Sequence, residues 1–381
     1  MTRNPLAPRT YLLRNAGRTL PLVGVIVLAI LLITGIVALM NSIPYSIRTI
    51  YKYSAKYTGV ASRASGNVTD EAFAIIKRES PVPLGRIVRA RGSQAQVKSI
   101  VGGWPFVVLA MGQEDIRYYL RRMGNPPVDG RLPRPGAPEI LVSEPVARNL
   151  RLGLGDAILG PDNPDSYSPL PVKIVGIAKT DYWLMLAPIE YHREFHFPPS
   201  DALLVFAQNE ADQPRLDRWI NERMKGEQVR IFAYFLLEKE TNDMFRILYQ
   251  ILNVVIFTLV IVITLMMGML INIYLSQRIQ EFGLLQALGY TKSDLIKRVL
   301  GESALVVLVG WALGLAAALG MLRVVKQRLM DPNAFALDPW DRSAYFYTLP
   351  VPIMIFVVAV GTMFLRFRRF DPVGVVERRL V

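Results

Sequence analysis

Four long stretches of this chain contain no Asp, Glu, Lys or Arg. They are 29, 31, 20 and 23 residues long and lie at 19–47, 247–277, 303–322 and 343–365. Each reaches the roughly 20 residues that a helix needs to cross about 30 Å of hydrocarbon. The pattern predicts four membrane-spanning helices, which we place at 21–40, 247–275, 303–322 and 347–365.

The first apolar stretch also has to be weighed as a secretory signal. Its apolar core, from Pro21 to Met40, is longer than the roughly 7–15 residues of a signal peptide. No A-x-A-like cleavage site follows it cleanly. We therefore expect an uncleaved helix, with a cleaved signal peptide as the alternative.

Basic residues near the span ends predict how the chain is oriented. The first 18 residues, the segment between the second and third spans, and the C-terminal tail together hold 13 basic residues and five acidic ones. The long segment between the first and second spans is closer to balance, with 27 basic and 23 acidic residues. Both termini are therefore predicted to be cytoplasmic, and the long segment to face outside.

The predicted fold class is an α-helical membrane protein, with four transmembrane helices in a 1+3 layout and a large α+β extracytoplasmic domain. The parts in chain order are the cytoplasmic N-terminal segment 1–20, the first span 21–40, the outer domain 41–246 with helical stalk ends, the second span 247–275, a cytoplasmic loop 276–302, the third span 303–322, a short extracytoplasmic loop 323–346, the fourth span 347–365 and a cytoplasmic tail 366–381.

Residues from about 62 to 228 alternate between helical and strand-like patterns. Helices are expected after Asp70 and at 114–123, 144–152 and 214–225. Strands are expected at 86–91, 104–110, 139–143, 171–178, 202–207 and 229–235. Interleaved elements of both kinds favour a mixed sheet that is covered by helices.

Segments on either side of the outer domain carry opposite charges. Arg48, Lys52 and Lys56 recur every fourth residue after the first span, and Glu240 and Asp243 precede the second span. If both segments extend the membrane helices, the three cations share one helical face. Our hypothesis is a stalk in which the basic and acidic faces meet. The alternative is two separate faces in water or among lipid head groups, with neighbouring tyrosines as an interfacial belt.

The segment between the second and third spans has the clearest local signals. The second span is expected to continue as a helix to Leu288, because Gly289 suits the left-handed conformation that ends helices. Thr291 and Asp294 then resemble a capping box that begins the next helix. The pattern predicts a short cytoplasmic helix, a sharp turn, and the third span.

An apolar ridge is predicted on this short helix, formed by Leu284, Leu285 and Leu288. A ridge of this kind on a cytosolic helix needs cover. The groove of a partner protein would supply it, and the alternative is packing against other helices of this chain.

Composition and motifs argue against catalysis by this chain. Cysteine is absent, which excludes disulfides and thiolate chemistry. Neither a G-x-x-x-x-G-K-[ST] phosphate loop nor a G-x-S-x-G elbow occurs in the sequence. His192 and His196 have the spacing of metal ligands on a helix, but Pro198 and Pro199 follow at once. We interpret this region as a loop with aromatic anchors, and a metal site there as the alternative.

The positions of the charged residues argue against several further classes of function. The net charge of +13 follows from the predicted topology, so nucleic acid is not an expected partner. The spans contain no charged residue, which argues against a proton-coupled transporter and against a channel lined by a charged ring.

Several motifs accompany the 1+3 layout of the spans. The outer domain contains V-S-E-P-V-A at 142–147, L-G-L-G-D-A-I at 152–158 and V-K-I-V-G-I at 172–177, and the tail contains R-F-D-P-V at 369–373. The cytoplasmic motif consists of Arg278, Glu281, Phe282, Gly283, Leu285, Ala287, Leu288 and Gly289. With these motifs the chain resembles the FtsX/MacB family of ABC transporter permeases, the mechanotransmission type to which the LolC/LolE subunits are related. Residues 180–200 match no part of the family pattern.

The resemblance implies a transport subunit rather than an enzyme. The permease would form a homo- or heterodimer and bind two copies of a separate ABC ATPase, which would carry ATP and Mg while this chain binds no cofactor. The coupling helix that contacts the ATPase would comprise Arg278, Glu281, Phe282, Gly283, Leu285, Leu288 and Gly289.

The function implied is export or extraction of an amphiphilic substrate, such as a lipid, lipoprotein, peptide or drug, at a bacterial inner membrane. A periplasmic adaptor or substrate-binding protein and membrane lipid are further expected partners. The main alternative is an FtsX-like regulator that couples a cytoplasmic ATPase to a cell-wall hydrolase outside. A bacitracin-type sensing permease fits less well, because those chains carry ten helices.

Overall fold

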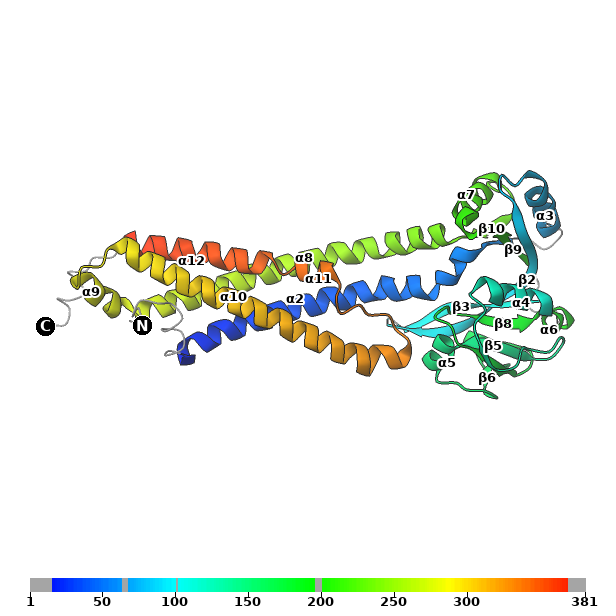
Figure 1. The fold of residues 1–381 in the computed structure, drawn as a ribbon, viewed down its shortest axis with the longest axis horizontal. Helices are drawn as coiled ribbons and strands as arrows, with labels where there is room; N and C mark the ends of the chain where they lie inside the picture. The colour runs from blue at the N-terminus through cyan, green and yellow to red at the C-terminus, as the bar shows by residue number, and fades with distance from the viewer. Residues whose placement is uncertain (1–15, 64–67, 101, 196–200, 369–381) are drawn as a thin grey trace. The chain divides into compact units, whose positions relative to one another are not determined.

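The computed structural model describes residues 16–63, 68–100, 102–195 and 201–368 (Figure 1). The described residues form two compact units. The helical unit contains residues up to 40, 247–326 and those from 338 onward. The sheet unit contains residues 41–246 and, in addition, 327–337. The N-terminal segment before residue 16, the motif at 369–373, and His196 with the two prolines after it lie outside the described residues.

Within the described residues, four helices are long and apolar enough to cross a membrane: α2 (Ala16–Ile50), α8 (Tyr234–Gln277), α10 (Lys292–Val325) and α12 (Pro350–Arg368). One of these helices precedes the strands of the sheet unit in the chain and three follow them. This number and order confirm the predicted fold class. Residues 41–50 of α2 and 234–246 of α8 belong to the sheet unit, so each of these helices has residues in both units.

Shorter elements connect the long helices. Helix α9 (Ile279–Ala287) lies between α8 and α10 in the chain. After α10 come a π-helical turn, η4 (Lys326–Met330), a 3₁₀ turn, η5 (Asp331–Asn333), and the short helix α11 (Arg342–Phe346), before α12 begins.

Two glycines on one face of α10 allow a close approach to α2. A Cβ added to Gly310 would lie 2.9 Å from Cβ of Ile26, and one added to Gly314 would lie 2.7 Å from Cβ of Ile30. Ile26 and Ile30 are fully buried in this contact. Small residues with this spacing let two membrane helices pack backbone against side chain.

The sheet unit is built on one mixed sheet in which the described strands follow the order β10-β1-β9-β2-β3-β8-β5-β7-β4, with β6 on β7. Strands β3 and β8 and strands β5 and β7 pair in parallel, and the other pairs are antiparallel. The strand bounds are β1 Thr58–Ser62, β2 Leu84–Ser99, β3 Gly102–Met111, β4 Val128–Gly130, β5 Glu139–Ser143, β6 Ala157–Leu159, β7 Val172–Ala178, β8 Met185–Pro188, β9 Asp201–Ala207 and β10 Val229–Phe232.

Helices cover this sheet over two apolar clusters. The helices are α3 (Val68–Glu79), α4 (Gln113–Arg122), α5 (Glu144–Leu150), α6 (Ile189–Glu194) and α7 (Gln213–Arg223), together with the 3₁₀ turns η1 (Lys52–Lys56), η2 (Pro164–Ser166) and η3 (Glu210–Asp212). The smaller cluster joins α3 and α7 to β1 and β9, and the larger one contains side chains of β2, β3, β5, β7 and β8. Trp183 is buried in the larger cluster.

Three sequence predictions for this unit need correction. Strand β2 extends well beyond 86–91, because its polar second half pairs with β3 as a hairpin. The predicted strand at 229–235 ends at Phe232, since α8 begins at Tyr234. The region around His192, predicted as a loop, lies in helix α6, which follows strand β8, an element between β3 and β5 that was not predicted.

The segment 327–337 between the third and fourth spans is tied to the rest of the sheet unit by polar side chains. Asn149, which is fully buried, accepts a hydrogen bond from the Lys98 amide (2.8 Å) and donates to the carbonyls of Lys98 (3.0 Å) and Asn333 (2.7 Å). Ser46 Oγ donates to the Ala336 carbonyl (3.1 Å) and accepts from its amide (3.0 Å). The loop is therefore part of this unit.

We expect Gly314→Ala to destabilise the helical unit, because Cβ of Ile30 is attached to a backbone that cannot yield to the new methyl group. Overpacking of this kind costs about 1–3 kcal/mol. The measurement is the thermal unfolding midpoint of the purified chain in one detergent. The matched control is Gly320→Ala on the same helix, where a Cβ would meet nothing within 4 Å. Equal midpoints for the two variants would contradict the close packing of α2 and α10.

A second prediction concerns Asp217 on α7, which is buried against β1. Its Oδ1 accepts hydrogen bonds from Thr58 Oγ1 (2.5 Å) and Gln213 Nε2 (2.9 Å), but burial outweighs them and raises the pKa of Asp217 from 3.8 to about 6. The folded state therefore favours the protonated carboxyl. Its contribution to stability is fully present below about pH 4 and is lost as the pH rises through about 6, by up to about 3 kcal/mol.

Hydrogen-exchange protection of α7 in the full chain, corrected for the intrinsic pH dependence of exchange, should fall between pH 4 and pH 7. Asp217→Asn keeps an oxygen acceptor without the charge, so its protection should not depend on pH in this range. If protection of α7 in the Asn variant falls with pH as it does in the wild type, Asp217 is not the group that causes the pH dependence.

Candidate functional site

The junction between α8 and α10 is organised by local backbone signals. Helix α8 ends at Gln277, because Arg278 leaves the helical conformation with φ −105° and ψ 5°. Helix α9 follows and ends at Ala287, with Leu288 as its C-cap residue, and Gly289 then adopts φ +95°, the left-handed conformation predicted for it. The predicted continuous helix to Leu288 is thus interrupted at Arg278.

Helix α10 begins with a capping box, as predicted. Thr291 Oγ1 accepts a hydrogen bond from the Asp294 amide (3.2 Å), and Asp294 Oδ2 accepts one from the Thr291 amide (3.2 Å). The two reciprocal bonds satisfy backbone donors that the first helical turn leaves open.

The side chain of Arg278 is fully buried at this junction. Its Nη1 donates to Glu302 of α10 and to the Tyr274 hydroxyl (2.8 Å), and its Nε donates to Glu281 (2.9 Å). The guanidinium also lies over two rings, 5.1 Å from the centroid of Tyr274 and 5.2 Å from that of Phe282. One side chain therefore links the end of α8, α9 and the beginning of α10.

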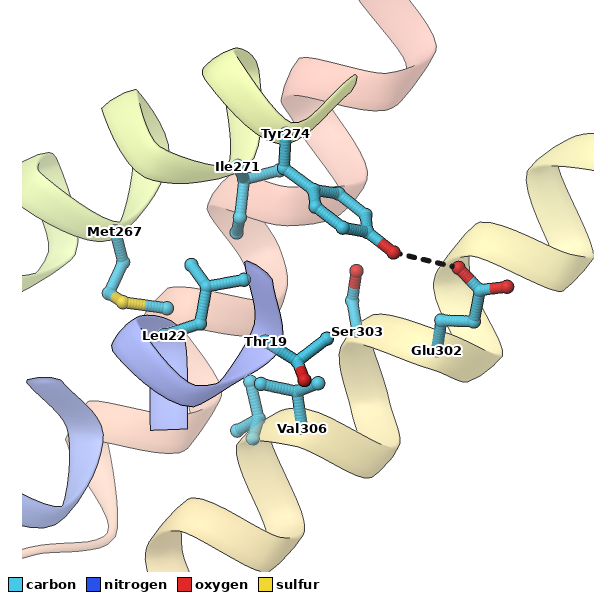
Figure 2. A pocket seen from close by; sticks show the side chains of 9 residues that line it. Thr19, Leu22, Met267, Ile271, Tyr274, Glu302, Ser303 and Val306 are labelled. Atoms are coloured by element: carbon cyan, nitrogen blue, oxygen red, sulfur yellow. Dashed lines mark hydrogen bonds between the residues drawn. The ribbon is translucent and has the colours of Figure 1, made fainter. Parts of the chain in front are cut away.

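Glu302 is the acceptor at the centre of this network. Only 1% of the residue is exposed, and it also accepts hydrogen bonds from the Tyr274 hydroxyl (3.2 Å) and from Arg298 Nε (3.2 Å). Figure 2 shows the Tyr274 hydroxyl pointing at Glu302. Both residues line a small cavity of about 20 Å³, whose wall also includes Leu22 and Met267. The pocket has room for about one water molecule, so it is not a substrate site.

Opposite charges balance in this buried cluster. Two arginines, Arg278 and Arg298, face two carboxylates, Glu281 and Glu302. Burial opposes the charge of the Arg278 guanidinium, but its hydrogen bonds to Glu302 and Glu281 raise the pKa of Arg278. A buried ion pair is costly to break from one side, because the remaining charge loses its partner without regaining water.

The predicted coupling residues divide into a buried and an exposed group. Arg278, Phe282 and Gly283 are buried, and the burial of Arg278 means that it holds the helix rather than offering a contact surface. The exposed group comprises Glu281, Leu288 and Gly289, and Leu285 is half-buried.

Leu284 of α9 and Leu288, the C-cap residue of this helix, are both exposed leucines. They are 67% and 70% exposed and are four residues apart, so they lie on one side of the helix. Neither is covered within the described residues of this chain.

The sequence missed the parts of the network that lie on other helices. Tyr274 and Arg298 were not among the predicted site residues, although each lies four residues before the partner it supports, Arg278 and Glu302 respectively. That i, i+4 spacing of complementary side chains is the signal that would have found them.

The predicted stalk does not form one basic face. Helix α2 ends at Ile50, and Lys52–Lys56 form a 3₁₀ turn, whose three residues per turn place i and i+4 on different sides. The three cations contact three different groups. Arg48 donates to Asn242, Lys52 lies over the ring of Tyr182, and Lys56 pairs with Glu210 at 2.5 Å.

Glu240 and Asp243, the predicted acidic face of the stalk, form no ion pair with these cations within the described residues. The prediction of two charged faces that meet is therefore wrong in its pairing. Asn242, which the charge pattern did not include, is the residue of α8 that Arg48 contacts.

The described residues contain no group of three or more side chains that could hold a metal ion, and His196 of the histidine pair lies outside them. His192 lies on α6, is fully buried, and its Nδ1 lies 3.1 Å from the Pro188 carbonyl. Burial lowers the pKa of His192, which favours the neutral ring.

The buried cluster generates a prediction about stability. Glu302→Leu leaves the Arg278 guanidinium buried without its carboxylate, and this should lower the free energy of unfolding by about 3–5 kcal/mol. The double variant Arg278→Met/Glu302→Leu removes both charges and should recover most of the loss. The unfolding midpoint in detergent measures the stability of the single and the double variant. Glu281→Gln is the control and should change the midpoint less, because the Glu281 side chain is half-exposed. A double variant as unstable as the single one would refute the coupling.

Comparisons with known proteins bear on this region directly. Residues 253–372, which include α9, α10 and the fourth span, match the family model described as FtsX-like permease C-terminal. No curated protein matches the chain.

Two solved structures overlap the chain at low similarity. The periplasmic region of MacB from Actinobacillus actinomycetemcomitans has 10% identity and a TM-score of 0.30, covering 51% of this chain and 94% of that one. The extracellular domain of the ABC-type transporter YknZ from Gram-positive bacteria has 12% identity and a TM-score of 0.27, covering 46% and 100%. TM-scores this low carry no argument, so the assignment depends on the family model. Residues 253–372 are therefore similar to the C-terminal domain of FtsX-like permeases, which agrees with the resemblance seen in the sequence.

Proposed function

We propose that this chain works with a separate cytoplasmic ATPase, which docks on α9 and drives the export or extraction of an amphiphilic substrate. The observation that carries the proposal is a short helix with two exposed leucines, anchored by a buried ion pair. The resemblance to FtsX/MacB permeases supports a complex with two ATPase copies and two permeases, with ATP and Mg bound by the ATPase.

The exposed face of α9 suits a protein groove. Leu284 and Leu288 would enter apolar pockets of the ATPase, a mode of recognition in which a helix uses anchors at i and i+4. Glu281, which is half-exposed on the same helix, would lie at the rim of that contact.

The ion pair explains how a movement of α9 would reach the spans. Arg278 is one residue before α9 and contacts Glu302 on α10, so a displacement of α9 acts on the ends of α8 and α10 together. A flexible loop in the same place would absorb the displacement.

The spans favour an amphiphile that does not pass through a polar pore. The four predicted spans contain no Asp, Glu, Lys or Arg, so they offer no charged lining for a hydrophilic solute. Because α2 and α8 each have residues in both units, they are the elements by which ATP-driven movement would reach the sheet unit.

The test is recovery of an ATPase with the detergent-solubilised chain, co-expressed with ABC ATPases encoded by the same organism. Leu284→Asp/Leu288→Asp should weaken the association at least tenfold, because a charge would have to enter an apolar pocket. The control is Leu154→Asp, since Leu154 is an exposed leucine in the sheet unit, with 52% of the residue accessible.

Undiminished association of the aspartate variant would overturn docking on α9. Recovery of a cell-wall hydrolase through the sheet unit, in a cell that shows no transport defect, would instead favour the FtsX-like regulator as the function.

A further inference from the structure

A groove of about 620 Å³ lies along α10 in the helical unit, bordered by α11 and by Leu349, which precedes α12. Its size falls within the range of small-molecule sites in proteins, about 300–1,000 Å³. Apolar and aromatic side chains dominate its lining, among them Trp311, Leu315, Leu319, Trp340 and Phe346. One charged residue, Arg342, also lines it.

Hydrogen bonds hold the aromatic side chains of the groove in place. Trp311 Nε1 donates to Thr348 Oγ1 (3.2 Å), and the Tyr345 hydroxyl donates to the Pro339 carbonyl (2.6 Å). The groove is thus formed by side chains that are already oriented. Tryptophan and tyrosine in such numbers are typical of the boundary between hydrocarbon and water.

The positive charges at the groove have no acidic partner. Arg342 is exposed, Arg323 lies over the ring of Trp340 at 5.3 Å, and neither forms an ion pair within the described residues.

Two carboxylates that are close to Arg342 in the chain accept hydrogen bonds from the backbone. Asp338 accepts a hydrogen bond from the Trp340 amide (2.9 Å), and Asp341 accepts one from the Ser343 amide (3.0 Å) as the N-cap of α11. The edge of the groove therefore offers guanidinium groups to an anion.

We propose that this groove binds one anionic lipid, with an acyl chain along Leu315, Leu319 and Phe346 and the head group at Arg342. A small soluble anion would leave the apolar length of the groove exposed, and a zwitterionic lipid would leave the guanidinium without a net negative partner. The site is separate from α9 and does not depend on an ATPase.

Native mass spectrometry of the purified full chain, titrated with phosphatidylglycerol and with phosphatidylcholine of the same acyl chains, tests the proposal. One phosphatidylglycerol should bind about fivefold more tightly, the preference expected of one basic residue near a lipid surface. Arg342→Gln should abolish this preference. Arg328→Gln, at an exposed arginine outside the groove, should retain it.

A second variant separates the groove from its charged edge. Ala316→Phe fills the groove without changing a charge, because Ala316 is part of its lining. It should weaken binding of both lipids, and a short-chain phosphatidylglycerol should bind poorly to the wild type.

Three results would overturn the proposal. They are equal binding of the two lipids, unchanged binding in Ala316→Phe, and a dimer peak that Ala316→Phe abolishes while lipid adducts persist. The last result would mean that a second copy of this chain occupies the groove.

Discussion

A buried arginine at the junction of α8 and α9 is the constraint on which the membrane part of this protein depends. A guanidinium removed from water is tolerated only when carboxylates and ring faces surround it. Arg278 meets this condition with Glu302 on α10, Glu281 on α9 and the rings of Tyr274 and Phe282. Meeting it fixes three helix ends at once, and it also determines which side of α9 carries the exposed leucines.

The close contact between α2 and α10 complements this junction further along the same helix. Gly310 and Gly314 admit Ile26 and Ile30, so α10 is held by an ion pair near its beginning and by side-chain packing in its middle. Packing depends on fit, and the ion pair depends on charge balance. The two kinds of contact therefore respond differently to a push from a partner. Bending the packed middle would separate Gly310 and Gly314 from Ile26 and Ile30, whereas moving the other end would change the distances between Arg278 and its carboxylates.

Local rules predicted the spans, the turn at Gly289 and the capping box at Thr291, because each is decided by residues close in sequence. The burial of Arg278 could not be predicted in this way, since its main partner Glu302 is 24 residues away. The predicted pairing of charges in the stalk was wrong because the prediction assumed that the α-helix continues through Lys52 and Lys56, whereas α2 ends at Ile50. Strand β8 was missed because four buried residues contain too little alternation to distinguish a strand from a loop.

The segment 327–337 has a consequence for exchanging domains between related permeases. By sequence it is only the connection between the last two spans, yet Asn149 and Ser46 fasten it to the sheet unit. A chimera that transplants residues 41–246 alone would bring in a buried asparagine whose carbonyl partner comes from the recipient. The part that folds together is therefore discontinuous in sequence. A chimera that carries both 41–246 and 327–337 should keep the structure of the sheet unit, whereas a chimera that carries 41–246 alone should not.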